Sequence, residues 1–464
     1  MNIGKRVVTV VRQNFVGARR VLRWMMNAVV RVEIWLLMVL YVILVFSDRI
    51  PIAGLAALCL IWIARWVTTG TLSARTPMDM PILTILIMVP VSLYASVDWT
   101  LSLPKVYGII LGVALFYAVV NWVHTMREVW LAAFGVVLIS AAFALLGLVG
   151  TDWSESKLFA LPQIYGRLPH LIRGIPRSLG GGFHPNGIGG TLIFFVPVLV
   201  SLLLVSGDLK RTQFVANNLL LRVWRAWHRH ILVGCLLLTL FTLILTKSRG
   251  SFMGVTVGLL ALGIWRDRRF LWAIPAATLG LFVAVQVWGG EALAQFALRM
   301  DAVGGGVTGT MQGRMEVWQR AIYMIQDFPY TGIGIGTFDK VANAMYPFFL
   351  LGPDARATHA HNTLLEVGVD VGIPGMVAYM ALLTCFAVAA WHAYHTLSDR
   401  TLQALIVGLA CGMLAHQVFG LTDAFLLGTK PGVVMWAFLG LVAALYVHRK
   451  SLWRELEQDS TSGA

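Results

Sequence analysis

Long apolar runs separated by short polar segments extend from residue 32 to residue 447. A helix needs about 20 mostly apolar residues to cross a hydrocarbon core of roughly 30 Å, and somewhat fewer where flanking side chains snorkel. The pattern therefore predicts an all-α, polytopic membrane protein with about 12 transmembrane helices. The predicted spans are Val32–Phe46, Ile50–Val67, Met80–Val97, Val106–Trp122, Val129–Val149, Gly187–Val205, Ile231–Leu245, Phe252–Trp265, Phe270–Val287, Ile373–Trp391, Leu402–Phe419 and Val433–Val447.

Two of the connections between these runs are long. The first covers residues 150–186, and the second covers residues 288–372, which is enough chain for a small helical domain. We therefore divide the chain into a bundle of nine spans over residues 1–287, a loop domain over residues 288–372, and three further spans with a tail over residues 373–464.

A helical pattern is present inside the second loop. Over residues 313–327, the apolar side chains Met315, Trp318, Ile322 and Ile325 recur at helical spacing. The polar residues Arg314, Gln319, Arg320 and Gln326 are expected on the opposite face. This pattern predicts a helix that lies along the membrane surface.

Composition and charge agree with a membrane protein and define its orientation. The chain is 58% hydrophobic and 12% charged, whereas a soluble domain carries roughly 25% charged residues. The net charge of +14 could indicate nucleic acid, but most basic residues fall on one side of the predicted spans, as the positive-inside rule requires. We therefore expect cytoplasmic termini, long loops on the outer face and no nucleic-acid partner.

Two basic segments, residues 1–31 and 210–230, intersperse arginines with valine, leucine and tryptophan. This composition is typical of interfacial helices that lie on anionic membrane lipid. No small-residue cleavage site follows the first apolar run, so we expect that run to be an anchor and not a cleaved signal peptide.

The turn Thr246–Gly250 places Lys247 and Arg249 at the outer membrane boundary, against the positive-inside rule. One interpretation is that these cations simply snorkel at a helix end. The other is phosphate binding, because a guanidinium offers a planar fork that matches phosphate oxygens.

The sequence His359-Ala360-His361-Asn362 stands just before the tenth span. Two histidines invite a metal hypothesis, but a metal needs a third ligand, and the chain contains no HExxH, CxxC or DxD pattern. The alternatives are an ordinary polar boundary residue, or acid/base work on a substrate hydroxyl or phosphate, since imidazole titrates near neutral pH.

Two glycine-rich segments accompany these candidates. Gly332-Ile333-Gly334-Ile335-Gly336 is no dinucleotide fingerprint, because no buried strand precedes it and no crossover unit surrounds it. The approach to the sixth span contains Arg173, Arg177, His184 and Asn186, and it is either an ordinary loop or a substrate contact.

Taken in order, these segments resemble the bacterial superfamily of O-antigen ligases and O-antigen polymerases, which also contains protein O-oligosaccharyltransferases. The matching elements are Gly182–Asn186, Ser248-Arg249-Gly250, Gly313-Arg314-x3-Trp318-x2-Ala321 continuing through Pro329 into Gly332-x-Gly334-x-Gly336-x-Phe338, and His361-Asn362-x2-Leu365 with Gly372 beyond.

The resemblance implies a fold like that of GT-C glycosyltransferases and a transfer reaction that uses neither metal nor cofactor. A glycan would leave an undecaprenyl diphosphate carrier at the periplasmic face of the bacterial inner membrane and join an acceptor hydroxyl. By similarity, Arg249 and Arg314 would hold the diphosphate, and His361 would activate the hydroxyl. Fixed cations suit this task, because the departing diphosphate develops negative charge. Further candidates for substrate binding are Lys247, Arg177, Asn186, Arg320, His359, Asn362 and Arg356.

Four functions remain under comparison. The first is an O-antigen ligase of lipopolysaccharide biosynthesis, which would use the lipid A–core oligosaccharide as acceptor. A polymerase would extend another lipid-linked chain from the same donor. A protein O-oligosaccharyltransferase usually carries an additional C-terminal region. A transporter of lipid-linked sugars would place ionisable residues within its spans and show inverted repeats, whereas these spans are nearly free of charge and the sequence shows no strong internal repeat.

Overall fold

The computed structural model describes most of the predicted spans and loops. The described residues are 26, 28, 32–46, 52–151, 153, 183–208, 219–291, 295, 311–352, 355–424, 427–429 and 431–462. Over these ranges the chain is helical, and the one extended pairing is an isolated bridge between Thr151 and Phe183. The all-α membrane fold is therefore confirmed. Arg173, Arg177 and nearly all of the basic segment 1–31 lie outside the described residues.

Every predicted span falls in a helix. The helices over the predicted spans are α2 (Glu33–Phe46), α3 (Ile52–Thr69), α4 (Asp79–Ala95), α5 (Trp99–Trp122), α6 (Met126–Gly150), α8 (Pro185–Leu192) with α9 (Phe195–Leu204), α10 (Leu219–Thr246), α11 (Arg249–Arg266), η2 (Arg268–Trp272) with α12 (Ala273–Trp288), α16 (Thr363–Thr396), α17 (Arg400–Phe419) and α18 (Gly432–Ser462). Among the described residues, nine helices are long and apolar enough to cross a membrane, whereas α2 and α4 are shorter apolar helices.

The basic segment before the seventh span is not a separate helix over its described part. Residues 219–246 form one continuous 28-residue helix, α10. No glycine or proline lies between Leu219 and Ile231, so nothing breaks the backbone hydrogen bonding where the basic part meets the apolar part. The prediction of an independent interfacial helix is therefore wrong for residues 219–230.

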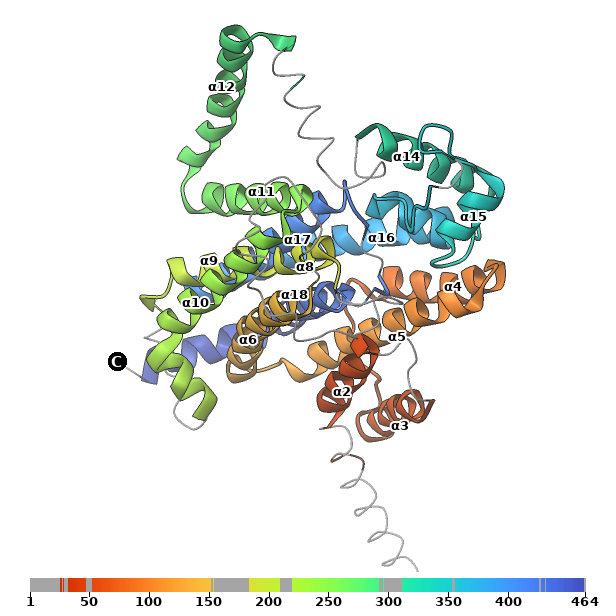
Figure 1. Cartoon of the computed structure of the whole chain (residues 1–464). Coiled ribbons are helices and arrows are strands. Elements are labelled where there is room, and N and C mark those ends of the chain that lie inside the picture. The colour runs from red at the N-terminus through yellow and green to blue at the C-terminus, as the bar shows by residue number, and fades with distance from the viewer. Residues whose placement is uncertain are drawn as a thin grey trace, which may run out of the picture.

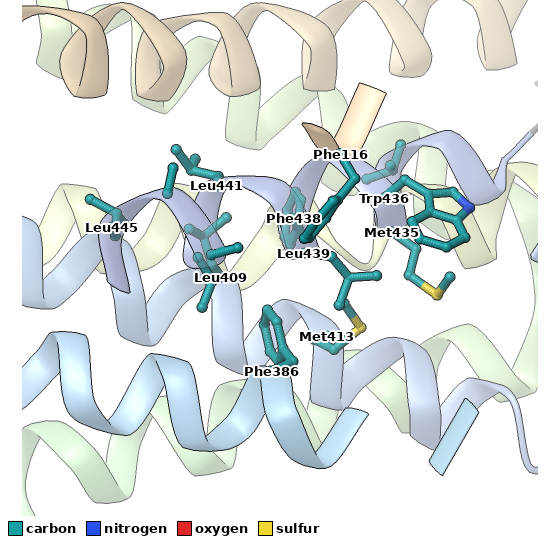
Figure 2. Close-up of a cluster of buried hydrophobic side chains, with 14 of the residues drawn as sticks. Phe116, Phe386, Leu409, Met413, Met435, Trp436, Phe438, Leu439, Leu441 and Leu445 are labelled. Carbon is teal, nitrogen blue, oxygen red and sulfur yellow. The ribbon is translucent and has the colours of Figure 1, made fainter. Parts of the chain in front are cut away.

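The centre of the bundle lies where α18 packs against α5, α16 and α17. Figure 2 shows the side chains that fill this region, among them Phe116, Phe386, Met413 and Trp436. A Cβ atom at Gly112 would lie 2.2 Å from the Trp436 ring, so the absence of a side chain there lets α5 approach α18. Such close packing of small against large residues stabilises helix pairs in lipid, where the hydrophobic effect between helices is weak.

The outer loop forms a helical lobe with its own apolar cluster. It contains α14 (Met311–Asp327) and α15 (Phe338–Met345), and Figure 1 shows both beside α16, at the end of the bundle opposite the marked C-terminus. Val317, Ala321, Met324 and Phe338 are buried in this cluster.

The predicted faces of the α14 helix are partly wrong. Met315 and Ile322 are exposed, whereas Arg320, which the pattern assigned to the outward polar face, is buried. A neighbouring carboxylate, Glu316, makes this burial possible, because a buried guanidinium needs a charged partner.

Candidate functional site

The site is organised around the first turn of α16. Asn362 is the N-cap of this helix, and its side-chain oxygen accepts hydrogen bonds from the backbone N–H groups of Leu364 (3.0 Å) and Leu365 (3.1 Å). The residue before it, His361, has a φ of 50°, in the left-handed region that is uncommon for residues other than glycine. The structure therefore assigns Asn362 a helix-capping role and turns the histidine segment sharply into α16.

Two imidazoles meet one carboxylate above this turn. The Nε2 atom of His359 lies 3.5 Å from Oδ1 of Asp423, and the Nδ1 atom of His361 lies 3.6 Å from the same oxygen. Asp423 is buried and follows the end of α17. No motif points to Asp423, because a single aspartate some 60 residues from the histidines belongs to no local pattern.

The hydrogen bonds of His359 define its protonation. Its Nδ1 atom accepts the backbone N–H of His361 at 3.2 Å, so we infer that the ring proton is on Nε2, which faces Asp423. Burial and, after it, the neighbouring His361 lower the pKa of His359 to about 3, and Asp423 only partly opposes this shift. His359 is therefore a neutral ring with both nitrogens engaged.

His361 differs from His359 in the nitrogen that it leaves available. With Nδ1 directed at Asp423, its Nε2 atom has no hydrogen-bond partner among the described residues. Burial alone would raise the pKa of Asp423, but the two neighbouring imidazoles, His361 above all, hold it below its usual range. Asp423 is therefore an anion that can orient the His361 ring and stabilise it when it is protonated.

The loop before the sixth span contributes Asn186. Its Nδ2 atom donates a hydrogen bond to Oδ2 of Asp423 at 3.1 Å. Asn186 is in the first turn of α8, where the N-cap His184 accepts the backbone N–H of Asn186 through Nδ1 at 3.2 Å. Asn186 therefore contacts the same carboxylate as the two histidines, and its role in substrate binding stays a prediction.

The Ser-Arg-Gly element lies against the same segment. Ser248 is the N-cap of α11, and Arg249 is the first residue of that helix. A Cβ atom at Gly250 would lie 2.5 Å from Oγ1 of Thr422, the residue before Asp423. Only glycine allows this approach, so the motif fixes the Arg249 backbone close to the histidine cluster.

The Gly-Arg-x3-Trp element of α14 borders the cluster from the outer lobe. Nε1 of Trp318 donates to the carbonyl oxygen of His361 at 3.4 Å. Arg314 precedes Trp318 by four residues and therefore shares its face of the helix. Arg249 and Arg314 thus belong to two elements that both contact the segments carrying His361 and Asp423.

Two other predicted arginines are engaged elsewhere. Arg320 pairs with Glu316 at 3.4 Å, and its Cζ atom lies 5.1 Å from the centre of the Phe349 ring. Arg356 is exposed and pairs with Asp339 at 3.2 Å. No contact recorded among the described residues brings either arginine to the histidine cluster.

The glycine-rich segment, residues 332–336, packs closely against two membrane helices. Gly332, Gly334 and Gly336 have φ values of 67°, 102° and 78°, which glycine adopts without strain. A Cβ at Gly334 would lie 2.5 Å from Cα of Ser96, and one at Gly336 would lie 2.8 Å from Nζ of Lys105. The motif therefore packs the outer lobe onto the ends of α4 and α5. The sequence did not indicate Lys105, which is an isolated lysine between apolar stretches.

Comparison with known proteins gives two findings. Residues 234–380 match the family described as O-antigen ligase (Wzy_C). The chain is also similar to a protein of Rhizobium meliloti (strain 1021) named "Exopolysaccharide production protein ExoQ", with 29% identity over 163 residues that cover 33% of this chain and 37% of that protein. The alignment thus spans just over a third of the relative. The matched family region contains Arg249, Arg314 and both histidines of the cluster, whereas Asn186 and Asp423 lie outside it.

Proposed function

We propose that this chain, which belongs to the O-antigen ligase and O-antigen polymerase superfamily, transfers a glycan from a lipid diphosphate to an acceptor hydroxyl with His361 as general base. Members of this family are glycosyltransferase-like enzymes of polysaccharide biosynthesis. The observation that carries the proposal is the pairing of His361 Nδ1 with the buried Asp423, which leaves Nε2 for a substrate. A general base of this kind must reach the proton that it removes.

The proposed step uses the chain's own groups and balances without a co-reactant. The acceptor hydroxyl gives its proton to Nε2 of His361, and its oxygen forms a bond to the anomeric carbon of the donor. The bond from that carbon to the diphosphate oxygen breaks, and the electron pair leaves with the diphosphate. Arg249 and Arg314 then face the developing charge, and Asp423 stabilises the imidazolium.

We assign the acceptor as the lipid A–core oligosaccharide and the donor as an undecaprenyl-diphosphate-linked polysaccharide. The reaction would then be the O-antigen ligase step at the periplasmic face of the bacterial inner membrane. This assignment rests on the resemblance of the ordered motifs and on the basic residues that predict cytoplasmic termini. A second candidate is polymerisation of lipid-linked repeat units, and the similar Rhizobium protein is named for exopolysaccharide production.

Deletion of the gene followed by gel analysis of cell carbohydrate separates these two candidates. The ligase assignment predicts that all polysaccharide-capped lipopolysaccharide disappears while long lipid-linked polymer accumulates. Caps of a single repeat unit would instead identify the polymerase. If the deletion changes neither the lipopolysaccharide nor the lipid-linked polymer, both functions are rejected.

The histidine cluster also has the shape of a cation site. One ligand atom from each of His359, His361 and Asp423 lies within 4.8 Å of the others. We nevertheless propose metal-independent transfer, because Asn186 Nδ2 already donates a hydrogen bond to Asp423 and the two imidazoles lie beside its other oxygen. A chelator added to the purified reaction is expected to leave the rate unchanged within error. Strong inhibition that zinc reverses would contradict this proposal and establish the cluster as a metal centre.

A further inference from the structure

A buried carboxylate holds the loop between the two histidines. Oε2 of Glu366 accepts the backbone N–H of Ala360, the residue between His359 and His361, at 2.5 Å. Glu366 has no exposed surface and lies in the first turn of α16. This contact acts together with the Asn362 cap, and the two fix both ends of the sharp turn at His361.

The turn needs such support because its backbone is strained. The left-handed region is sterically unfavourable for a residue that carries a Cβ atom. His361 has this conformation, with a φ of 50°. If the Ala360 N–H lost its acceptor, the segment could relax towards an extended conformation and turn the His361 ring away from Asp423.

The buried position of Glu366 lowers the stability of the fold, which argues against a purely structural role for this residue. Asp370 lies one turn further along the same face of α16, and its Oδ1 atom accepts the backbone N–H of Gly336 at 2.9 Å. Oε1 of Glu366 and Oδ2 of Asp370 are both buried, and neither has a hydrogen-bond partner among the described residues. Lys105, beside Gly336, is the nearby cation. Well-packed apolar residues would stabilise such a position at least as well as a buried carboxyl group with an unpaired oxygen does.

We propose that Glu366 is a positioning residue for the transfer reaction and that its carboxylate, through the Ala360 N–H, holds His361 against Asp423. This role rests on the proposed function of His361. Glu366 itself touches no substrate in this account, and it acts through the backbone of the histidine loop.

Two substitutions separate the hydrogen bond from the charge. Glu366→Gln keeps an acceptor oxygen for the Ala360 N–H, whereas Glu366→Leu removes it. For Glu366→Leu we expect kcat to fall by about 100-fold, the loss associated with a misplacement of about 1 Å, with little change in the donor KM. Glu366→Gln is expected to restore most of kcat. Equal losses of kcat in both variants would overturn the proposal, because the charge and not the hydrogen bond would then be decisive.

Chemical labelling of the histidines tests the same loop without any activity assay. In Glu366→Leu, diethyl pyrocarbonate is expected to modify His359 and His361 several times faster than in the wild type, as measured by mass spectrometry of the peptide that contains both. The control is Asp79→Leu, because Asp79 is also a carboxylate that accepts a backbone N–H, that of Thr76 at 3.0 Å, and it lies at the start of α4, the end away from the glycine-rich segment. Labelling of the histidine peptide should not change in this control.

The labelling result distinguishes failure of this inference from failure of the proposed function. Unchanged labelling in a folded Glu366→Leu variant would overturn the positioning role, whatever the activity. Faster labelling combined with full activity of a His361→Ala variant would keep the loop contact but reject the catalytic function. If Glu366→Leu does not insert into the membrane, Glu366→Gln decides alone: wild-type kcat and labelling support the role, and a large loss of kcat with unchanged labelling overturns it.

Discussion

His361→Ala is expected to lower the rate of glycan transfer by about 10²- to 10⁴-fold, the range that general bases contribute. The variant removes the ring whose Nε2 atom we assign to the acceptor proton, while His359 cannot replace it because both of its nitrogens are engaged. Polysaccharide-capped lipopolysaccharide on gels of complemented deletion cells measures the effect. Asp423→Asn should lower transfer for the related reason that the ring loses its orientation and its counter-charge.

Backbone strain at position 361 requires a second variant as control. Alanine tolerates the φ of 50° poorly, whereas asparagine is among the residues that adopt the left-handed region most readily. His361→Asn should therefore be inactive but as stable as the wild type. His395, near the cytoplasmic end of α16 in the predicted topology, provides a control for loss of an imidazole, and His395→Ala should remain active. Normal capping in both position-361 variants would reject the catalytic assignment.

Arg249→Ala is expected to reduce transfer by about 10²- to 10³-fold, the effect of removing one group that stabilises developing negative charge. Arg249→Lys should recover only part of the rate, because an ammonium keeps the charge but lacks the planar fork of the guanidinium. The rate of lipid diphosphate release from a labelled donor by purified variants measures both effects.

The matched control lies at the other end of the same helix. Arg266 is the last residue of α11, far along the helix from the site. Arg266→Ala removes the same side chain from the same element and should leave the rate unchanged. Equal rates for wild type and Arg249→Ala would show that the Ser-Arg-Gly turn is only a boundary feature of the membrane helix.

The sequence predicted the helices well because each apolar run reports directly on the lipid that surrounds it. It also predicted that separate segments meet at the site, and Asn186, Arg249 and His361 do lie on elements that contact one carboxylate region. The roles of these three residues remain predictions. They rest on the order of the motifs along the chain, whereas the apolar periodicity predicted only the helices.

Other features depend on tertiary contacts that no local pattern records. Asp423 is a single aspartate after α17, and only the fold brings it to the histidines. Arg320 was expected on an exposed face of α14, but its partner Glu316 and the Phe349 ring bury it. A helical pattern shows which residues share a face, but it does not show which polar residues find partners inside a lobe.

The most direct test of the proposed reaction uses the purified protein in liposomes. The donor is an undecaprenyl-diphosphate-linked glycan, and the acceptor is lipid A–core oligosaccharide. The measured quantity is the lipid diphosphate released together with the glycan joined to the acceptor. We predict equal amounts of the two products with wild type, dependence on the acceptor, and loss of both products with His361→Asn. Equal product formation by His361→Asn, or no transfer to any hydroxyl by the wild type, would contradict the account.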